Sequence, residues 1–281
     1  MKHRFIHTLW TKPFVQKGQT DKLEMQKYLY GLSLAYLRQL DCEVCLYTDE
    51  LGYSLLGGLP YTEIRACLDQ IIPQDISPAY FACCKAYALL QEPLGVIHID
   101  GDVFIKSQAI LDRCFNHTCD VLVQNVEPFV FSNNRTAFGL LDGILCKTRL
   151  ADGIMYPELH DFNVGTLGFF NEEAKQKYID NYLTLMHAAN AEIPEKTYQV
   201  NSAYFATPDL VMEQGQLYWL CKKNDYRVQV LLCNATPEIC YTNATELGYC
   251  HLICHTKYER INDVKRKLIE TFPDVYHAIV S

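Results

Sequence analysis

The stretch GVIHIDGDVFIKS, residues 95–107, decides the fold expected for this chain of 281 residues. Its first five residues form the apolar run of a buried strand. Asp100 and Asp102 follow directly, separated by one glycine. Two carboxylates this close repel each other unless a divalent cation lies between them or one of them holds a proton. The stretch therefore predicts a strand that ends in a metal site.

Strand and helix patterns alternate on either side of this stretch. The segments expected as strands in the first part of the chain are 4–10, 43–48, 95–99 and 119–126. The segments expected as helices between them are 23–40, 60–71, 79–91 and 107–116. This alternation is typical of βαβ units, and it predicts an α/β fold with a mixed, mostly parallel sheet and helices on both faces. The carboxyl ends of such strands face the ligand crevice, so Asp100 is expected at its mouth.

The second half of the chain is less regular. Strands are expected at 162–171 and 227–233, and helices at 172–189, 208–224 and from Asn262 to about Ile279. No repeat or low-complexity linker divides the chain. We therefore expect a single domain with a C-terminal helical extension.

The amino-acid composition limits the kinds of partner that the protein is expected to bind. The net charge of −8, from 25 basic and 33 acidic residues, provides no broad cationic surface for nucleic acid or anionic lipid. No apolar segment reaches the length of a signal-peptide core or a membrane span, so we expect a cytoplasmic protein without an integral membrane segment. The thirteen cysteines are an odd number, and several lie in apolar runs, where a free thiol behaves as a small buried hydrophobe.

An apolar strand followed by Asp-x-Asp near residue 100, after an α/β half, resembles the metal-binding motif of metal-dependent glycosyltransferases with the GT-A fold. Two downstream segments resemble the glycogenin-like and bacterial nucleotide-sugar transferases of this kind. The segment HDFNVGTLGFF is similar to the strand that lines the donor and acceptor pocket, which implies binding roles for Asn163 and Gly165, with Asp161 beside them.

The segment HLICHTK is similar to the C-terminal histidine segment, which implies that His255 is the third metal ligand and that Lys257 contacts the diphosphate. Thr256 stands where the family usually has a glycine.

Looser matches imply further site residues. In VMEQGQLYW, Glu213 and Gln214 occupy the place of an acidic-Gln pair. Asp49 follows the strand 43–48, where the fold often contacts the nucleotide base. Lys85, in the helix before the Asp-x-Asp strand, is expected to reach toward the donor. The resemblance thus implies a nucleotide-binding half at 1–126, an acceptor and metal half at 127–260 and a C-terminal helix at 261–281.

The function implied by this resemblance is sugar transfer of the hexosyltransferase type. Mn²⁺ or Mg²⁺ held by Asp100, Asp102 and His255 would bridge the phosphates of a nucleotide-diphosphate sugar, most readily a UDP-sugar. The acceptor, whether carbohydrate, lipid-linked or protein, stays open, and so does the stereochemistry. Inversion needs a base on the acceptor hydroxyl, for which Glu213 and Asp161 are the candidates. Retention would leave groups such as Gln214 with a positioning role.

Two alternatives use the same residues differently. A nucleotidyltransferase or nucleotide-sugar pyrophosphorylase shares the sheet and the metal, but it usually opens with a glycine-rich loop, which TLWTKPFVQKG lacks. A zinc-stabilised interaction protein is the non-enzymatic alternative, because Cys250, His251, Cys254 and His255 have ligand chemistry for zinc. The identity of the bound metal would separate it from the transferase.

Overall fold

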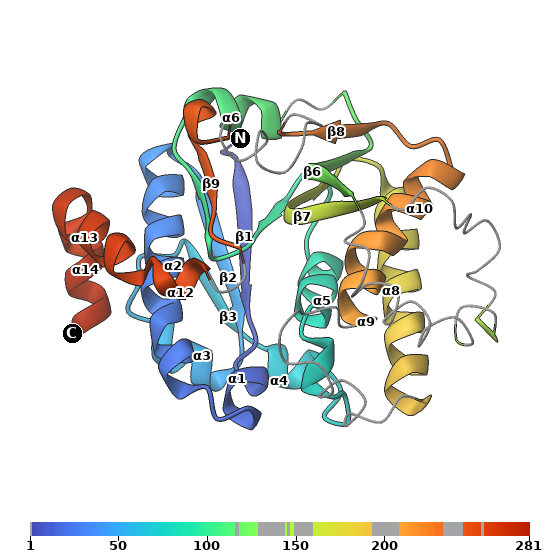
Figure 1. Cartoon of the computed structure of the whole chain (residues 1–281), viewed down its shortest axis with the longest axis horizontal. Helices are drawn as coiled ribbons and strands as arrows, with labels where there is room; N and C mark the ends of the chain where they lie inside the picture. Colours follow the sequence, from blue (N-terminus) through green and yellow to red (C-terminus); the bar gives the residue numbers. More distant parts are fainter. Residues whose placement is uncertain are drawn as a thin grey trace.

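A seven-stranded sheet forms the centre of the computed structural model, in the order β3-β2-β1-β4-β7-β6-β8 (Figure 1). The structure describes residues 2–115, 118–128, 144, 147–148, 160–192, 208–232, 244–253 and 256–281. The strands of this sheet are β1 (Arg4–Leu9), β2 (Glu43–Thr48), β3 (Glu63–Ala66), β4 (Ile97–Ile99), β6 (Val121–Pro128), β7 (His160–Phe169) and β8 (Val228–Val230). β7 runs antiparallel to both of its neighbours, whereas the other neighbouring pairs are parallel.

A second sheet holds only two strands, β5 (Val103–Ile105) and β9 (Tyr249–His251), which pair antiparallel. β4 and β5 are separated by only three residues, Asp100-Gly101-Asp102. The acidic motif is therefore the connection between the two sheets.

Helices cover both faces of the large sheet, as Figure 1 shows. One face packs against α5 (Cys83–Gln91), α8 (Glu172–Glu192) and α10 (Gln216–Lys223), and the other packs against α2 (Thr20–Gln39) and α6 (Gln108–Cys114). Residues that alternate along β2 enter opposite cores: Cys45 and Tyr47 one, Val44 and Leu46 the other. This double burial explains why the central strands read as continuous apolar runs.

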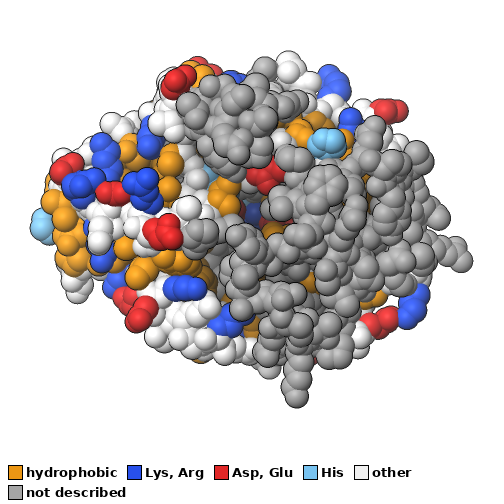
Figure 2. Space-filling view, in the orientation of Figure 1, with side chains coloured by type: hydrophobic (Ala, Val, Ile, Leu, Met, Phe, Trp, Pro, Cys, Tyr) orange, Lys and Arg blue, Asp and Glu red, His pale blue; other side chains and the backbone are white. Residues whose placement is uncertain are grey.

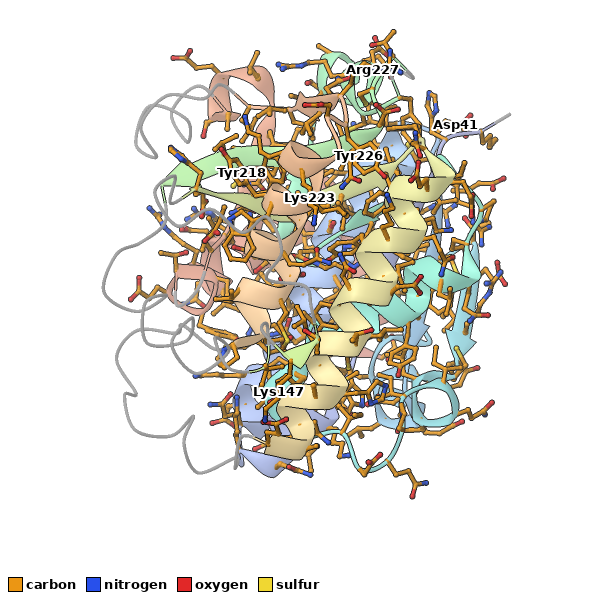
Figure 3. All side chains as sticks on the ribbon, turned by 90° about the vertical axis from the view of Figure 1, so that its right-hand side faces the viewer. Asp41, Lys147, Tyr218, Lys223, Tyr226 and Arg227 are labelled. Atoms are coloured by element: carbon orange, nitrogen blue, oxygen red, sulfur yellow. The ribbon has the colours of Figure 1, made fainter. Side chains whose placement is uncertain are left out.

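Short and terminal helices complete the chain. They are α1 (Lys12–Gln16), α3 (Glu50–Leu56), α4 (Leu68–Ile71), η1 (Pro78–Tyr80), α9 (Pro208–Leu210), η3 (Val211–Gly215), α12 (Thr256–Glu259), α13 (Ile261–Thr271) and α14 (Pro273–Val280). In the view of Figure 3, α8 and α10 lie side by side in front of the sheet, with Tyr218 and Lys223 on α10. No described helix is long and apolar enough to cross a membrane.

The predicted α/β class with a mostly parallel sheet, helices on both faces and a helical C-terminal extension is confirmed. The helix predicted at 60–71 is wrong in its first half, because Glu63–Ala66 pairs with β2 as the edge strand β3. The four residues of β3 are all half-buried, so the alternation of buried and exposed residues that marks a strand is absent. The C-terminal helix is two helices, since Pro273 has no N–H to continue the first one and begins the second.

Candidate metal centre

The acidic motif is held in place by the strands on either side of it. The backbone N–H of Asp100 donates to the carbonyl of Gly165 on β7 at 2.8 Å, which anchors the motif to the large sheet. Gly101 is required by packing, since a Cβ there would lie 2.3 Å from the ring of Tyr30. The Tyr30 hydroxyl donates to the Thr8 carbonyl at 2.5 Å, so this ring is fixed. A side chain between the two aspartates would displace it.

A histidine from the far end of the chain joins the two aspartates. β9 pairs with β5 so that His251 lies opposite Val103, one residue after Asp102. The ligand atoms of Asp100, Asp102 and His251 lie within 4.8 Å of one another. An ion whose bonds to its ligands are about 2.0–2.6 Å long bridges atoms up to about 5 Å apart. Two carboxylates and an imidazole nitrogen are therefore a donor set of suitable spacing for a divalent cation, the only such group found in the described part of the chain.

Lys257 neutralises Asp102. Its Nζ lies 2.6 Å from Asp102 Oδ2, while His251 Nε2 lies 3.5 Å from Asp102 Oδ1. Burial alone would raise the pKa of Asp102, but the charge of Lys257 opposes this, and that pKa lies below its usual value. Asp102 is therefore an ionised carboxylate in a buried place, which is what a cation ligand requires.

Lys85 plays the same part for Asp100. It reaches from α5 to within 3.2 Å of Asp100 Oδ1, 2.5 Å of Glu213 Oε1 and 3.2 Å of the Val164 carbonyl oxygen. Burial lowers the pKa of Lys85, but Asp100 and Glu213 raise it more, so the side chain stays charged. Burial raises the pKa of Glu213, and Lys85 opposes this.

The five groups of this cluster are Asp100, Asp102, His251, Lys85 and Lys257. Figure 2 shows acidic and basic side-chain atoms together near the middle of one face of the molecule. Glu213 extends the cluster from η3, a π-helical turn between α9 and α10. Such turns are frequent at functional sites, because the extra residue changes where side chains point.

A second acidic pair lies on β6 and β7. Asp161 is opposite Glu127 in the register of these strands, and Asn163 Nδ2 donates to Glu127 Oε1 at 2.8 Å. Burial, together with the charge of Glu127, raises the pKa of Asp161 to about 7. Asn163 Oδ1 accepts from the Gly165 N–H at 3.0 Å, which connects this pair to the strand segment beside Asp100.

His98, two residues before Asp100, has a buried nitrogen without a hydrogen-bond partner among the described residues. Its Nε2 lies 2.9 Å from Thr8 Oγ1, and its Nδ1 lies 3.8 Å from Asp100 Oδ1. Burial, then Lys85 and His7, lower its pKa well below the usual value, so the ring is neutral.

The other predicted site residues lie apart from this cluster or outside the described residues. Asp49 caps α3: it accepts from the Gly52 N–H at 2.8 Å and from the N–H and hydroxyl of Thr11 at 2.7 and 2.8 Å. Gln214 is half-buried on η3 next to Glu213. His255 lies outside the described residues, as does Cys254 of the predicted zinc cluster.

His251 is a candidate ligand that the sequence did not assign to the two aspartates. The sequence favoured His255 by likeness of motif, whereas the described histidine beside the aspartates is His251. The pairing of β9 with β5 places His251 beside the aspartates. Two three-residue apolar segments about 145 positions apart carry no sign in one sequence that they pair.

The chain was compared with curated proteins, solved structures and protein-family models. It matches no curated protein in sequence. It is similar to the crystal structure of mouse xyloside xylosyltransferase 1 in its apo form, with 12% identity and a TM-score of 0.44 over 91% of this chain and 99% of that one. It is also similar to galactosyltransferase LgtC in complex with donor and acceptor sugar analogues, with 12% identity and a TM-score of 0.42 over 93% and 94%. A family model matches residues 1–281, so the chain belongs to DUF6734, a family of unknown function.

Proposed function

We propose that this protein is a metal-dependent glycosyltransferase that takes a sugar from a nucleotide-diphosphate sugar, most readily a UDP-sugar. The observation that carries the proposal is the cluster of Asp100, Asp102 and His251, whose ligand atoms fit one divalent cation, with Lys85 and Lys257 beside it. Two carboxylates at the end of a buried strand do not attract a diphosphate on their own. A divalent cation between the carboxylates and the phosphates turns their repulsion into attraction.

The two aspartates, His251 and Lys257 are assigned to the leaving group. Asp100, Asp102 and His251 would hold Mn²⁺ or Mg²⁺, which supplies positive charge where the diphosphate departs. Lys257 lies 2.6 Å from Asp102, so its ammonium is within reach of the same phosphates. As the bond from sugar to phosphate breaks, negative charge grows on the diphosphate, and Lys257 stabilises it more strongly than in the bound donor.

Lys85, Glu213 and Asp161 are assigned to the sugar side of the site. Lys85 holds Glu213 at 2.5 Å and thereby fixes its carboxylate near the motif. Asp161, with a pKa of about 7, has the proton affinity suited to a base at neutral pH. If configuration is inverted, Asp161 or Glu213 takes the proton of the acceptor hydroxyl. If it is retained, Asn163 and Gln214 position donor and acceptor.

The remaining site predictions keep their roles within this proposal. Gly165 lets β7 approach the motif closely, and Asp49 is placed at the end of β2, where a nucleotide base is expected. The Asp49 carboxylate already accepts three hydrogen bonds, two of them from Thr11. Within this proposal Asp49 acts on the nucleotide base indirectly, because it fixes the position of Thr11 after β1.

A thermal-shift panel with uridine, guanosine and adenosine diphosphates and their sugars tests this function. A ligand at one hundred times its Kd stabilises the folded chain by about 2.7 kcal/mol. We expect UDP or a UDP-sugar to raise the Tm only when Mn²⁺ is present, and Asp102→Asn to abolish the shift. No Mn²⁺-dependent shift with any nucleotide would count against the proposal.

Other measurements separate the alternatives. Pyrophosphate release from a nucleoside triphosphate and a sugar phosphate would identify a nucleotidyltransferase instead. Zinc that survives purification and is required for folding would identify the interaction protein. Product stereochemistry, read by NMR once donor and acceptor are found, distinguishes inversion from retention.

A further inference from the structure

Gln124 lies directly behind the candidate metal ligand His251. It is fully buried on β6, where the pairing with β7 shifts register between Val123 and Asn125. Its Oε1 lies 2.9 Å from His251 Nδ1 and 2.7 Å from the Tyr249 hydroxyl. A single amide oxygen is therefore shared by the two inward-facing side chains of β9.

An amide oxygen only accepts hydrogen bonds, and this decides where the histidine proton lies. The Tyr249 hydroxyl donates to Gln124 Oε1, so Thr166 Oγ1, 2.8 Å from that hydroxyl, donates to Tyr249. His251 is then the second donor and carries its proton on Nδ1. Its Nε2 is left with a lone pair, on the side that faces Asp102 Oδ1 at 3.5 Å.

Gly165 makes room for this contact. A Cβ at this position would lie 2.6 Å from Gln124 Oε1 and 2.6 Å from His251 Cε1. The register shift of β7 against β6 brings the Gly165 backbone beneath both side chains. Irregularities of this kind are found next to active sites, where they redirect side chains.

The orientation of the amide has a consequence for the cation. With its nitrogen toward β9, the amide would donate to His251 Nδ1 and place the ring proton on Nε2, against Asp102. In the observed orientation the amide nitrogen is buried without a hydrogen-bond partner among the described residues. This orientation leaves the amide nitrogen unsatisfied, which is unfavourable, but its oxygen accepts from both Tyr249 and His251, and it leaves His251 Nε2 ready to bind a metal.

We propose that Gln124 is a positioning residue for His251: it keeps the ring proton on Nδ1 so that Nε2 stays free for a divalent cation. A metal-binding histidine is commonly held in this way by an acceptor on its other nitrogen. The role of Gln124 in metal binding rests on the proposed function, but its role in fixing the ring proton does not.

Two variants separate positioning from packing. Gln124→Glu keeps an acceptor for both donors, whereas Gln124→Met keeps the volume and removes it. Gln216→Met is the matched control, because Gln216 is also a buried amide but donates to the Tyr178 carbonyl on the other side of the sheet. None of these substitutions changes the three candidate ligands.

The first measurement is long-range ¹H–¹⁵N correlation on metal-free, ¹⁵N-histidine-labelled protein at a pH where the ring is neutral. We expect His251 to carry its proton on Nδ1 in the wild type, in Gln124→Glu and in Gln216→Met, and to lose this preference in Gln124→Met. The second is calorimetric titration with Mn²⁺ alone. Gln124→Met should weaken binding about 10- to 100-fold, and the other two variants less than about threefold.

A wild-type His251 protonated on Nε2 would overturn the proposal, and so would a folded Gln124→Met that binds Mn²⁺ as the wild type does. If Gln124→Met does not fold, the wild-type tautomer and Gln124→Glu decide. A proton on Nδ1 in a wild type that binds no Mn²⁺ would support the role of Gln124 in fixing the ring and overturn its role toward a metal. That result would contradict the proposed function separately.

Discussion

Substituting alanine for Gly165 should destabilise the chain and disturb His251 without touching a charged group. The added methyl group would lie 2.6 Å from Gln124 Oε1 and 2.6 Å from His251 Cε1, well inside contact distance. Gln124 is fully buried, and the His251 side chain is only 8% exposed. Neither group has solvent into which it can move, so the strand or the ring must shift.

The size of the effect follows from two opposing terms. Overpacking a close-packed site costs about 1–3 kcal/mol, and the two buried neighbours place Gly165 in the upper half of this range. Replacing glycine by alanine also restricts the unfolded chain, which returns about 0.4–1 kcal/mol. The φ of Gly165 is not positive, unlike those of Gly18, Gly95 and Gly248, so no backbone strain is added. We expect a net loss of about 1–2.5 kcal/mol.

Urea unfolding followed by circular dichroism measures this loss. Gly168→Ala is the control on the same strand, because its nearest contact is the Ile97 Cγ1 atom at 3.1 Å, a distance that a small side-chain shift relieves. We expect this variant to lose less than about 0.5 kcal/mol. Equal stability of Gly165→Ala and the wild type, or an equal loss in both variants, would refute the packing argument.

Three further predictions concern buried charged groups and the zinc alternative. Lys85→Met leaves Glu213 and Asp100 without their buried cation. It should therefore lower the free energy of unfolding by about 3 kcal/mol at neutral pH and by less in acid. A loss below about 1 kcal/mol in urea titrations would contradict the ion pairs. Burial raises the pKa of Asp209, on α9, to about 7, as it does that of Asp161, so folding favours the protonated acid. As the pH rises from about 4 to about 7, the free energy of unfolding should fall by up to about 1.4 kcal/mol per pH unit for each group. Asp209→Asn should remove about half of this slope, and an unchanged slope would contradict the assignment. Prolonged treatment with a strong zinc chelator should leave the Tm of the purified protein unchanged, whereas unfolding would favour the zinc-stabilised interaction protein.

The sequence predicted the central strands well because their burial leaves a strong signal. The strand at 43–48 was placed at its observed bounds, since every residue after Glu43 is buried. The segment 60–71 failed because its strand lies at the sheet edge, where half-burial produces no alternation. Edge strands are decided by the neighbour that they pair with, which is a property of the folded chain.

The acidic motif was predictable for the same reason, but not all of its partners were. Asp100 and Asp102 follow the largely apolar run GVIHI, so their charge stands out in the sequence. Lys85 lies 3.2 Å from Asp100, and its helix directly precedes the strand, so its place near the motif is readable in the sequence. His251 and Gln124 reach the motif only through strand pairing and a register shift, and neither leaves a mark in the order of residues.

Anomalous diffraction from crystals grown with Mn²⁺ and UDP tests the central claim most directly. The account predicts a manganese peak among the side chains of Asp100, Asp102 and His251, with diphosphate density on its open side next to Lys257, and no peak in Asp102→Asn. A peak elsewhere in the chain, or diphosphate bound without any metal at this cluster, would contradict it.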